Sequence, residues 1–332
     1  MAVRILVGDC RTRLRELPEQ SVQMCVTSPP YFGLRDYGMA DQIGLEQTPD
    51  AFVAELVAVF REVKRVLRDD GTLWLNLGDS YAGSGRGLMG DGTPSDRGDA
   101  KQGTNRGTTI GEYARPDWGL KPKDLVGIPW RVAFALQADG WYLRSDIIWH
   151  KPNPMPESVT DRPTKSHEYL FLLTKSASYY YDADAIAEPY ADSTLAAHSG
   201  RSTRVQEAQA EASDASGAGT RHGKGKTGLV NGEGRLDNGQ RNKRTVWTVP
   251  TSPYKGAHFA TFPPDLIEPC IKAGSKAGDI VLDPFGGAGT TGLVADRLGR
   301  NAILCELNPE YAQMAAERVK GDNPMFTDVD VR

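Results

Sequence analysis

A glycine-rich turn between an apolar strand and a helix is the feature that most limits how this chain can fold. Residues 279–291 (DIVLDPFGGAGTT) read as a short buried strand that ends in Asp283, followed by clustered glycines and the start of a helix. Glycine permits positive φ and lets a ligand approach the backbone closely. The next apolar strand ends in Glu306, where a carboxylate can accept from both hydroxyls of a ribose. These residues predict a parallel α/β sheet that binds a nucleoside-containing ligand at its carboxyl edge.

Strand-like and helix-like segments alternate along most of the chain, which is typical of a mostly parallel sheet with helices on both faces. Seven strands are expected, at residues 5–7, 24–27, 72–77, 145–150, 168–174, 280–282 and 302–306. Helices are expected at residues 51–67, 125–138, 265–273, 290–298 and 309–319. Apolar residues recur along 51–67 at the spacing that buries one helix face, and Gly71 is expected to end this helix.

Two long segments interrupt this alternation. Residues 82–119 are rich in Gly, Asp, Arg and Thr, and residues 190–245 in Ala, Ser, Gly and Arg, so neither has enough large apolar side chains for its own core. We therefore expect one α/β domain in two halves, 1–189 and 246–332, with 82–119 and 190–245 as insertions. The second insertion has a modest excess of basic residues. Both a solvated loop and a nucleic-acid-contacting segment fit that excess.

The composition argues against several classes of protein. A formal net charge of −4 is not that of a basic nucleic-acid-binding domain, so any such contact must be local. The four cysteines lie far apart and mostly in apolar segments, as free buried thiols do. The histidines show no HExxH pairing and no CxxC spacing occurs, so no metal site is expected. Without a membrane-length apolar run or a signal-like N-terminal segment, we expect a cytoplasmic protein with no membrane partner.

A second segment, residues 26–31 (VTSPPY), places polar groups at another strand end. Two consecutive prolines cannot continue a sheet because each lacks an N–H, so the strand must end at Ser28 in a rigid turn. The Ser28 hydroxyl and the Pro29 carbonyl can then accept hydrogen bonds at the edge where α/β ligands bind. By itself, the tetrapeptide is equally compatible with a simple turn that precedes a tyrosine.

A nicotinamide dinucleotide is the obvious rival ligand for the glycine turn. Asp283 would face its pyrophosphate with the wrong charge, whereas a carboxylate suits the ammonium group of a methionine moiety. No GxxxxGK[ST] sequence, the signature of a phosphate-binding loop, occurs.

Together the two segments resemble the amino-methyltransferase family of DNA methyltransferases. In that family a [DNS]-Pro-Pro-aromatic tetrapeptide is the catalytic motif, and a D-P-F-x-G-x-G-T-T segment begins the S-adenosylmethionine site. Their order here resembles the circularly permuted beta group. Residues 8–10, 64–80, 149–153, 165–171 and 258–263 resemble further segments of the family. The resemblance implies a Rossmann-like, circularly permuted methyltransferase fold, with a mostly parallel seven-stranded sheet, helices on both faces and two long insertions.

The resemblance also implies a cofactor, a substrate and a site. The cofactor is S-adenosyl-L-methionine, and the substrate is a base flipped out of double-stranded DNA. Residues 190–245 become the candidate target-recognition insertion, a cognate restriction endonuclease a candidate partner, and the oligomeric state stays open. The implied catalytic residues are Ser28, Pro29, Pro30 and Tyr31, and the implied cofactor-binding residues are Asp9, Asp283, Phe285, Gly286, Gly287, Gly289, Thr290, Glu306, His258 and Phe259.

The identity of the target amine follows from the first residue of the tetrapeptide. In the family, Ser at this position is associated mostly with N4 of cytosine and Asp with N6 of adenine, so Ser28 favours cytosine with adenine as the alternative. A cytosine C5-methyltransferase would need a nucleophilic Cys after Pro, but Pro269-Cys270 reads as the start of an amphipathic helix with Pro in its first turn. A protein glutamine methyltransferase would carry Asn in place of Ser28. A catalytically inactive DNA-binding protein would not need the cofactor segment.

Overall fold

The computed structural model describes residues 1–82, 119–121, 123–190, 240–251, 262–324 and 327–332. They form two compact units, 1–182 with 244–332 and 183–243. The second unit contains a short 3₁₀ turn, η2 (Asp184–Ile186), and an antiparallel pair of strands, β6 (Glu188–Pro189) and β7 (Gln240–Arg241). Within the described residues, no helix combines the length and apolar character needed to cross a membrane.

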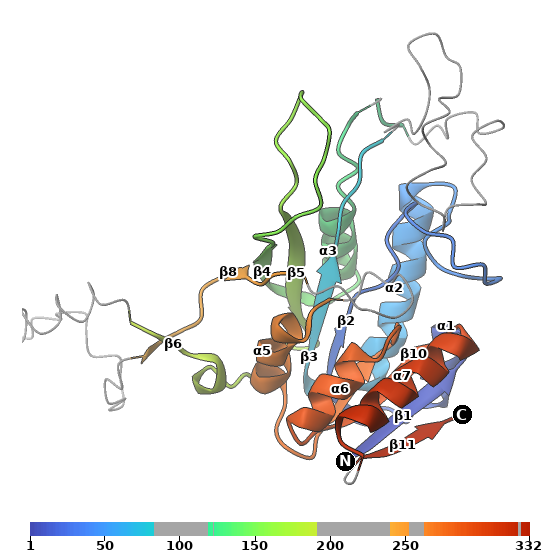
Figure 1. The fold of residues 1–332 in the computed structure, drawn as a ribbon, viewed down its shortest axis with the longest axis vertical. Helices are drawn as coiled ribbons and strands as arrows, with labels where there is room; N and C mark the ends of the chain where they lie inside the picture. Colours follow the sequence, from blue (N-terminus) through green and yellow to red (C-terminus); the bar gives the residue numbers. More distant parts are fainter. Residues whose placement is uncertain (83–118, 122, 191–239, 252–261, 325–326) are drawn as a thin grey trace, which may run out of the picture. The chain divides into compact units, whose positions relative to one another are not determined.

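The first unit is built on a nine-stranded sheet (Figure 1). In spatial order its strands are β11 (Asp328–Val331), β1 (Ala2–Val7), β10 (Asn301–Glu306), β9 (Ile280–Asp283), β2 (Val22–Thr27), β3 (Leu67–Leu77), β5 (His167–Thr174), β4 (Tyr142–His150) and β8 (Val246–Thr248). Only β5 runs against the others, so the carboxyl ends of the remaining strands share one edge. The predicted α/β fold with a mostly parallel sheet is confirmed. The sheet has two strands more than the seven expected. The additional strands are β8 and β11 at the edges of the sheet, which have only three and four residues and were not predicted.

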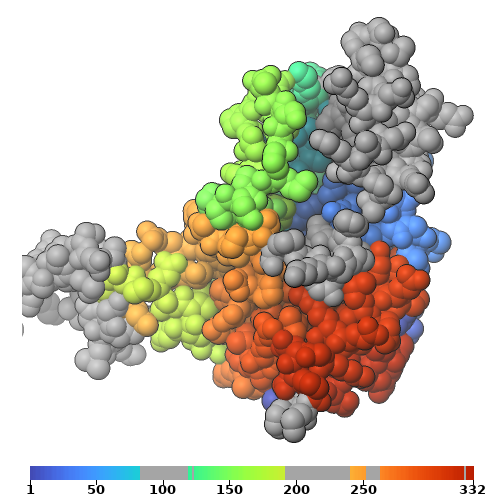
Figure 2. Space-filling model, viewed as in Figure 1, coloured from blue at the N-terminus to red at the C-terminus, as the bar shows by residue number. Residues whose placement is uncertain are grey.

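Helices cover both faces of this sheet (Figure 1). One set consists of α1 (Cys10–Arg13), a 3₁₀ turn η1 (Leu14–Glu16), α2 (Pro49–Val66) and α3 (Ile128–Ala138), and the other of α5 (Pro264–Gly274), α6 (Thr290–Arg297) and α7 (Pro309–Asp322). Figure 2 shows the orange and red residues of the second set together on the viewed face. Every expected strand and helix is present. The predicted apolar face of α2 is fully buried, at Phe52, Leu56, Val59, Phe60 and Val63.

Helix α2 runs directly into β3, which corrects the expected role of Gly71. The helix ends at Val66 and the strand begins at Leu67, so Gly71 lies inside the strand. A Cβ atom on Gly71 would lie 2.9 Å from the Arg68 carbonyl oxygen and 3.0 Å from that of Gln23. Gly71 therefore permits a close approach of β2 and β3, whose register shifts at this point.

Strands β2 and β9 are neighbours in the centre of the sheet. They pair in parallel, with Met24 opposite Val281 and Cys25 opposite Leu282. The Ser-Pro-Pro-Tyr turn follows β2 and the glycine turn follows β9, so the sheet brings together two segments that lie far apart in the sequence.

Candidate cofactor and substrate site

A pocket opens at the carboxyl edge of β1, β10, β9 and β2, where both predicted segments meet. Of the predicted site residues, its lining includes Asp9, Ser28, Pro29, Pro30, Tyr31, Asp283, Phe285, Gly286, Gly287, Thr290 and Glu306. Gly289 does not line the pocket, and His258 and Phe259 lie outside the described residues. The strand ends therefore place the two segments around one space.

The three glycines of the turn serve different purposes. Gly289, at φ 75°, precedes α6, and a Cβ atom there would lie 2.8 Å from the Ala315 Cβ. A Cβ atom on Gly286 would lie 3.0 Å from the Leu304 Cβ. Gly287, at φ 50°, lines the pocket, and a Cβ atom there would have its nearest neighbour, the Phe285 carbonyl oxygen, 3.9 Å away. Gly286 and Gly289 thus permit close packing of backbone, whereas Gly287 leaves room for a ligand.

The Glu306 carboxylate is oriented by backbone donors. Its Oε2 accepts from the Gly287 N–H at 2.8 Å and its Oε1 accepts from the Asn308 N–H at 2.9 Å. Burial raises the pKa of Glu306 above its ordinary value. Because an ionised carboxylate offers about four lone-pair sites, these two bonds leave acceptor capacity for a pair of ribose hydroxyls.

Asp283 differs from its expected orientation. Its side chain is 1% exposed. Its Oδ1 accepts from the Thr27 hydroxyl at 2.6 Å and the Phe285 N–H at 3.0 Å, and its Oδ2 accepts from the Thr291 hydroxyl at 2.6 Å. Burial raises the pKa of Asp283 to about 7. The carboxylate therefore joins the end of β2 to the glycine turn, although Asp283 is among the residues that line the pocket.

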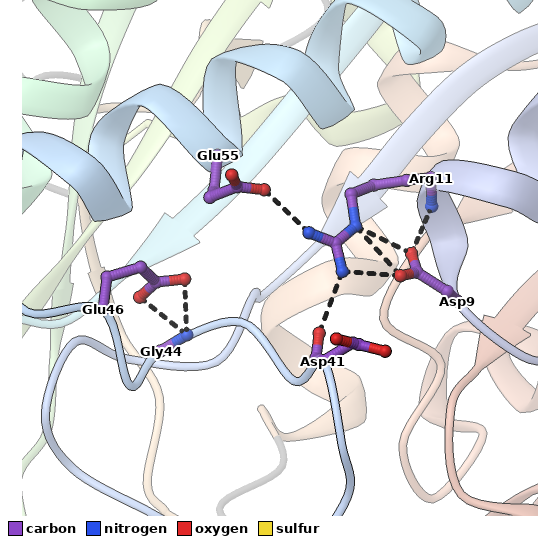
Figure 3. Close-up of polar contacts among 6 residues, drawn as sticks. All are labelled: Asp9, Arg11, Asp41, Gly44, Glu46 and Glu55. Carbon is purple, nitrogen blue, oxygen red and sulfur yellow. Dashed lines mark hydrogen bonds and ion pairs between the residues drawn. The ribbon is translucent and has the colours of Figure 1, made fainter.

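The Asp9 carboxylate is held by Arg11, as Figure 3 shows. The guanidinium binds both Asp9 oxygens at 2.6 to 3.0 Å, Glu55 Oε2 at 2.8 Å and the Asp41 carbonyl oxygen at 2.9 Å. Burial alone would raise the pKa of Asp9, but the hydrogen bonds and charge of Arg11 outweigh it and lower that pKa. Arg11 thereby ties the strand end after β1 to α2 and to the loop at residues 32–48.

That loop contributes lining that the sequence reasoning missed. Its members in the pocket are Leu34, Arg35, Tyr37, Met39, Asp41, Gln42 and Ile43. The other lining residues are Gly8, Cys10, Phe262 and Pro284, from segments that the family resemblance marks, and Cys305, Leu307, Asn308 and Tyr311, which it does not mark individually. A turn within the loop is closed by Glu46, whose carboxylate accepts from the Gly44 N–H at 3.0 and 3.2 Å (Figure 3). The sequence could have indicated this role through the length of the connection between the proline turn and α2, because long loops in compact domains are usually functional.

The Tyr31 ring is fixed at the pocket wall. A Cβ atom on Gly78 would lie 2.4 Å from Tyr31 Cε2, so the backbone of Gly78 covers part of the ring. The Tyr31 hydroxyl donates to Glu168 Oε2 at 2.6 Å, and the Ser28 hydroxyl lies 3.5 Å from the Tyr31 hydroxyl oxygen. Burial, together with the Glu168 charge, raises the pKa of Tyr31 well above its ordinary value. The phenol therefore stays protonated.

Cys270 lies away from this pocket. Its thiol is buried within α5 and lies 3.5 Å from the Leu266 carbonyl oxygen, to which it donates. Pro269 lies inside α5 instead of in its first turn, because the helix begins at Pro264. Cys270 is not among the pocket-lining residues, so its position does not suit a nucleophile acting at this site.

The charge of the lining suits a cationic nucleoside better than a pyrophosphate. Among the described lining residues, Asp41 and Glu306 bring negative charge and Arg35 is the basic one, whereas Asp9 is paired with Arg11 and the Asp283 carboxylate is buried in its own hydrogen bonds. S-adenosylmethionine carries a sulfonium and an ammonium group against a single carboxylate, so its net charge complements this lining. The Glu306 acceptors and the open side of Gly287 also fit its ribose and its close approach to the backbone.

The sheet, the pocket and the adjoining Ser-Pro-Pro-Tyr turn define an S-adenosylmethionine-dependent methyltransferase. Residues 22–317 match the family model described as DNA methylase, for N6 and N4 methyltransferases. The chain is 50% identical to the type II methyltransferase M.XycI of Xanthomonas campestris pv. cyanopsidis, over 95% of this chain and 87% of that protein. It is 49% identical to M.Cfr9I of Citrobacter freundii with the same coverage. The chain belongs to this family of DNA methylases.

Solved structures agree with this assignment. The putative DNA modification methylase TTHA0409 of Thermus thermophilus, in complex with S-adenosyl-L-methionine, superposes with a TM-score of 0.59 at 25% identity, covering 99% of each chain. The cytosine-N4-specific PvuII DNA methyltransferase shares the fold, with a TM-score of 0.58 at 19% identity over 99% of this chain and 96% of that one. S-adenosyl-L-methionine is the cofactor of this enzyme.

Proposed function

We propose that this enzyme transfers a methyl group to N4 of a cytosine that is flipped out of a specific duplex DNA site. The observation that carries the proposal is Ser28, which lines the pocket beside the glycine turn. Ser at this position is associated mostly with N4-cytosine methylation in the family that the chain resembles. N6 of adenine is the alternative target, because it also presents an exocyclic amine next to a ring nitrogen.

The chain's own residues have to orient this amine. The bound cofactor supplies an electrophilic methyl group, so no covalent nucleophile is needed. The amine is a poor nucleophile because its lone pair is conjugated with the ring. Hydrogen bonds to the Ser28 hydroxyl and the Pro29 carbonyl favour a more tetrahedral nitrogen, which stabilises the transition state more than the ground state. The rigid Pro29-Pro30 turn holds both acceptors in place.

Tyr31 is the proposed stacking platform for the flipped base. Extrusion of a base costs on the order of a few kcal/mol, and stacking on an aromatic ring contributes about 1–3 kcal/mol. The backbone of Gly78 covers part of the ring, and other parts of Tyr31 border the pocket. This arrangement supports a platform that is already in position before the base arrives.

DNA contact is proposed for the insertion at residues 190–245, because its modest excess of basic residues can bind phosphates, and the same insertion is the proposed source of side chains that reach base edges and read the sequence. M.XycI and M.Cfr9I are type II methyltransferases. We infer from them that this enzyme protects DNA within a restriction–modification system, with a cognate endonuclease acting on the same sequence.

Mass spectrometry of nucleosides tests the target base. Duplex DNA is incubated with the purified enzyme and S-adenosylmethionine and then digested, and we expect 4-methylcytosine as the only new nucleoside. The Ser28→Ala variant serves as the control and should bind the cofactor but form no product. Finding 6-methyladenine without 4-methylcytosine would overturn the cytosine assignment.

A further inference from the structure

A chain of polar side chains extends from the proline turn across the edge of the sheet. The Ser28 hydroxyl lies 3.5 Å from the Tyr31 hydroxyl, which donates to Glu168 Oε2 at 2.6 Å. The other Glu168 oxygen forms an ion pair with Lys151. Glu168 lies near the start of β5 and Lys151 directly after β4. Glu168 lies at the same edge as Ser28 because β5 is reversed, and Lys151 lies there because β4 runs in the direction of β2.

Asn76, in β3, contacts both Tyr31 and Glu168 in this series of polar side chains. Its Nδ2 donates to Glu168 Oε2 at 3.2 Å and to the Tyr169 carbonyl oxygen at 3.1 Å, which fixes the orientation of the amide. Asn76 Oδ1 then lies 3.2 Å from the Tyr31 hydroxyl as a second acceptor, so neither Glu168 nor Asn76 can donate to the Tyr31 oxygen. The Asn76 side chain is buried, and the Glu168 side chain is only 14% exposed. In a site this dry, the hydrogen-bonding state of each group is strongly defined.

The charge of Glu168 sets the direction of the hydrogen bonds. An ionised carboxylate only accepts, and Glu168 Oε2 at 2.6 Å is a nearer and more strongly charged acceptor for the single proton of the Tyr31 hydroxyl than Asn76 Oδ1 at 3.2 Å. The Tyr31 oxygen can then only accept from Ser28, and the Ser28 proton points toward Tyr31. The lone pairs of Ser28 consequently remain free for an incoming donor. The Ser28–Tyr31 bond, at 3.5 Å the longest, is the one that binding of a base would tighten.

We propose that Glu168, held by Lys151, is a positioning residue that acts through Tyr31 to make Ser28 a hydrogen-bond acceptor for the target amine. A serine hydroxyl alone could donate or accept, and only acceptance directs the lone pair of the amine toward the methyl group. This inference rests on the proposed function to the extent that the target is an exocyclic amine, and it holds for cytosine and adenine alike. Lys165 and His167 are further titratable groups beside Glu168, and neither brings a negative charge to it.

The Glu168→Gln variant tests this role. The amide keeps the shape of the side chain but can donate, so the order of hydrogen bonds is lost. We expect kcat to fall about 10- to 100-fold, because a hydrogen bond to a charged group is removed. The KM for DNA and the affinity for S-adenosylmethionine should change less than about twofold. Methyl transfer is counted with radiolabelled cofactor, so the measurement does not depend on which base is modified.

A double-mutant cycle with Tyr31→Phe separates this role from a purely structural one. Removal of the Tyr31 hydroxyl breaks the same series of hydrogen bonds between Ser28 and Glu168. The double variant should therefore lose no more kcat than the more impaired single variant. In the enzyme without ligands, the Cζ resonance of ¹³C-labelled Tyr31 should also shift in Glu168→Gln. That resonance is identified by its loss in Tyr31→Phe.

Glu157→Gln is the matched control, because Glu157 is another carboxylate of the β4–β5 connection, paired with Arg162 at 2.6 Å. It should leave kcat and the Tyr31 resonance unchanged. A wild-type kcat in Glu168→Gln, or losses that add in the double variant, would overturn the proposal. A 6-methyladenine product would overturn only the cytosine assignment.

Discussion

At the scale of single residues, the carboxylate of Asp283 has a structural task beside the pocket. It receives hydrogen bonds from Thr27 and Thr291, which belong to the two segments that meet there. Its burial raises its pKa from 3.8 to about 7. A group whose pKa is higher in the folded state contributes stability below its unfolded pKa, and this contribution is lost as the pH rises through the folded pKa.

We therefore predict that the stability of the enzyme falls, relative to Asp283→Asn, as the pH rises from about 4 to about 7. The change is at most on the order of 4 kcal/mol, because one pKa unit corresponds to about 1.4 kcal/mol. Urea unfolding of both proteins over this pH range measures it. Parallel pH profiles would show that folding leaves the pKa of Asp283 unchanged.

Glu306→Gln should weaken the binding of S-adenosylmethionine about 10- to 100-fold. The amide has one oxygen, so its NH₂ group would face one of the two backbone donors, Gly287 or Asn308, and a bond to a charged group contributes about 1.5–3 kcal/mol. Isothermal titration calorimetry measures the affinity. Glu310→Gln, at an exposed carboxylate in the first turn of α7, is the control and should bind normally. Equal affinities would remove Glu306 from the cofactor site.

The sequence predicted which residues stand at the strand ends but not where their side chains point. Asp9, Asp283 and Glu306 line one pocket because parallel strands end at one edge. The partners of Asp9 and Asp283 are Arg11, Thr27 and Thr291, and nothing in the periodicity of the chain indicates these pairings. The same holds for Glu168, since its role depends on the tertiary placement of the reversed strand β5.

At the scale of elements, the loop at residues 32–48 is anchored by Phe32, which packs on Phe52 of α2, and by the side chain of Arg11. Arg11 binds the carbonyl oxygen of Asp41, a non-glycine residue at φ 64°. That conformation is unfavourable for an L-residue and persists only when its surroundings hold it. The Asp9–Arg11–Glu55 ion pairs provide such a support (Figure 3).

Arg11→Ala should loosen this loop and weaken cofactor binding, because several lining residues lie in it. We expect faster amide hydrogen exchange at residues 33–44 and an affinity for S-adenosylmethionine that is roughly tenfold lower, equivalent to about 1.4 kcal/mol. Arg61→Ala is the control, because the exposed Arg61 of α2 pairs with Asp139 and neither residue lines the pocket. Unchanged exchange in the loop would show that other contacts hold it.

Elements with strong hydrophobic periodicity were predictable, and short edge elements were not. The buried face of α2 was read correctly from Phe52 to Val63. Strand β11 has the sequence Asp-Val-Asp-Val, which carries too few apolar residues to stand out. Gly71 was misread because a glycine after a helix usually ends it, whereas here the helix had already ended at Val66.

At the scale of the whole molecule, the role of the second insertion can be tested by its removal. Replacing residues 191–239 with a short Gly/Ser linker retains β6 and β7. We predict an unchanged affinity for S-adenosylmethionine, because the pocket is formed by other residues, together with a loss of sequence-specific methylation. Calorimetry measures the first, and sequencing that detects modified bases directly measures the second. A variant that remains specific would transfer recognition to residues 82–119.

The pairing of β2 with β9 has a consequence for synthesis of the enzyme. Thr27 and Asp283 are 256 residues apart in the chain. At about 5–20 residues per second, a ribosome takes roughly 10–50 s to reach the second strand after the first. During this time β2, which becomes an inner strand, has an unpaired edge that can associate with other nascent chains. Slower translation should therefore lower the soluble yield of this enzyme, unless a chaperone covers that edge until the C-terminal strands emerge.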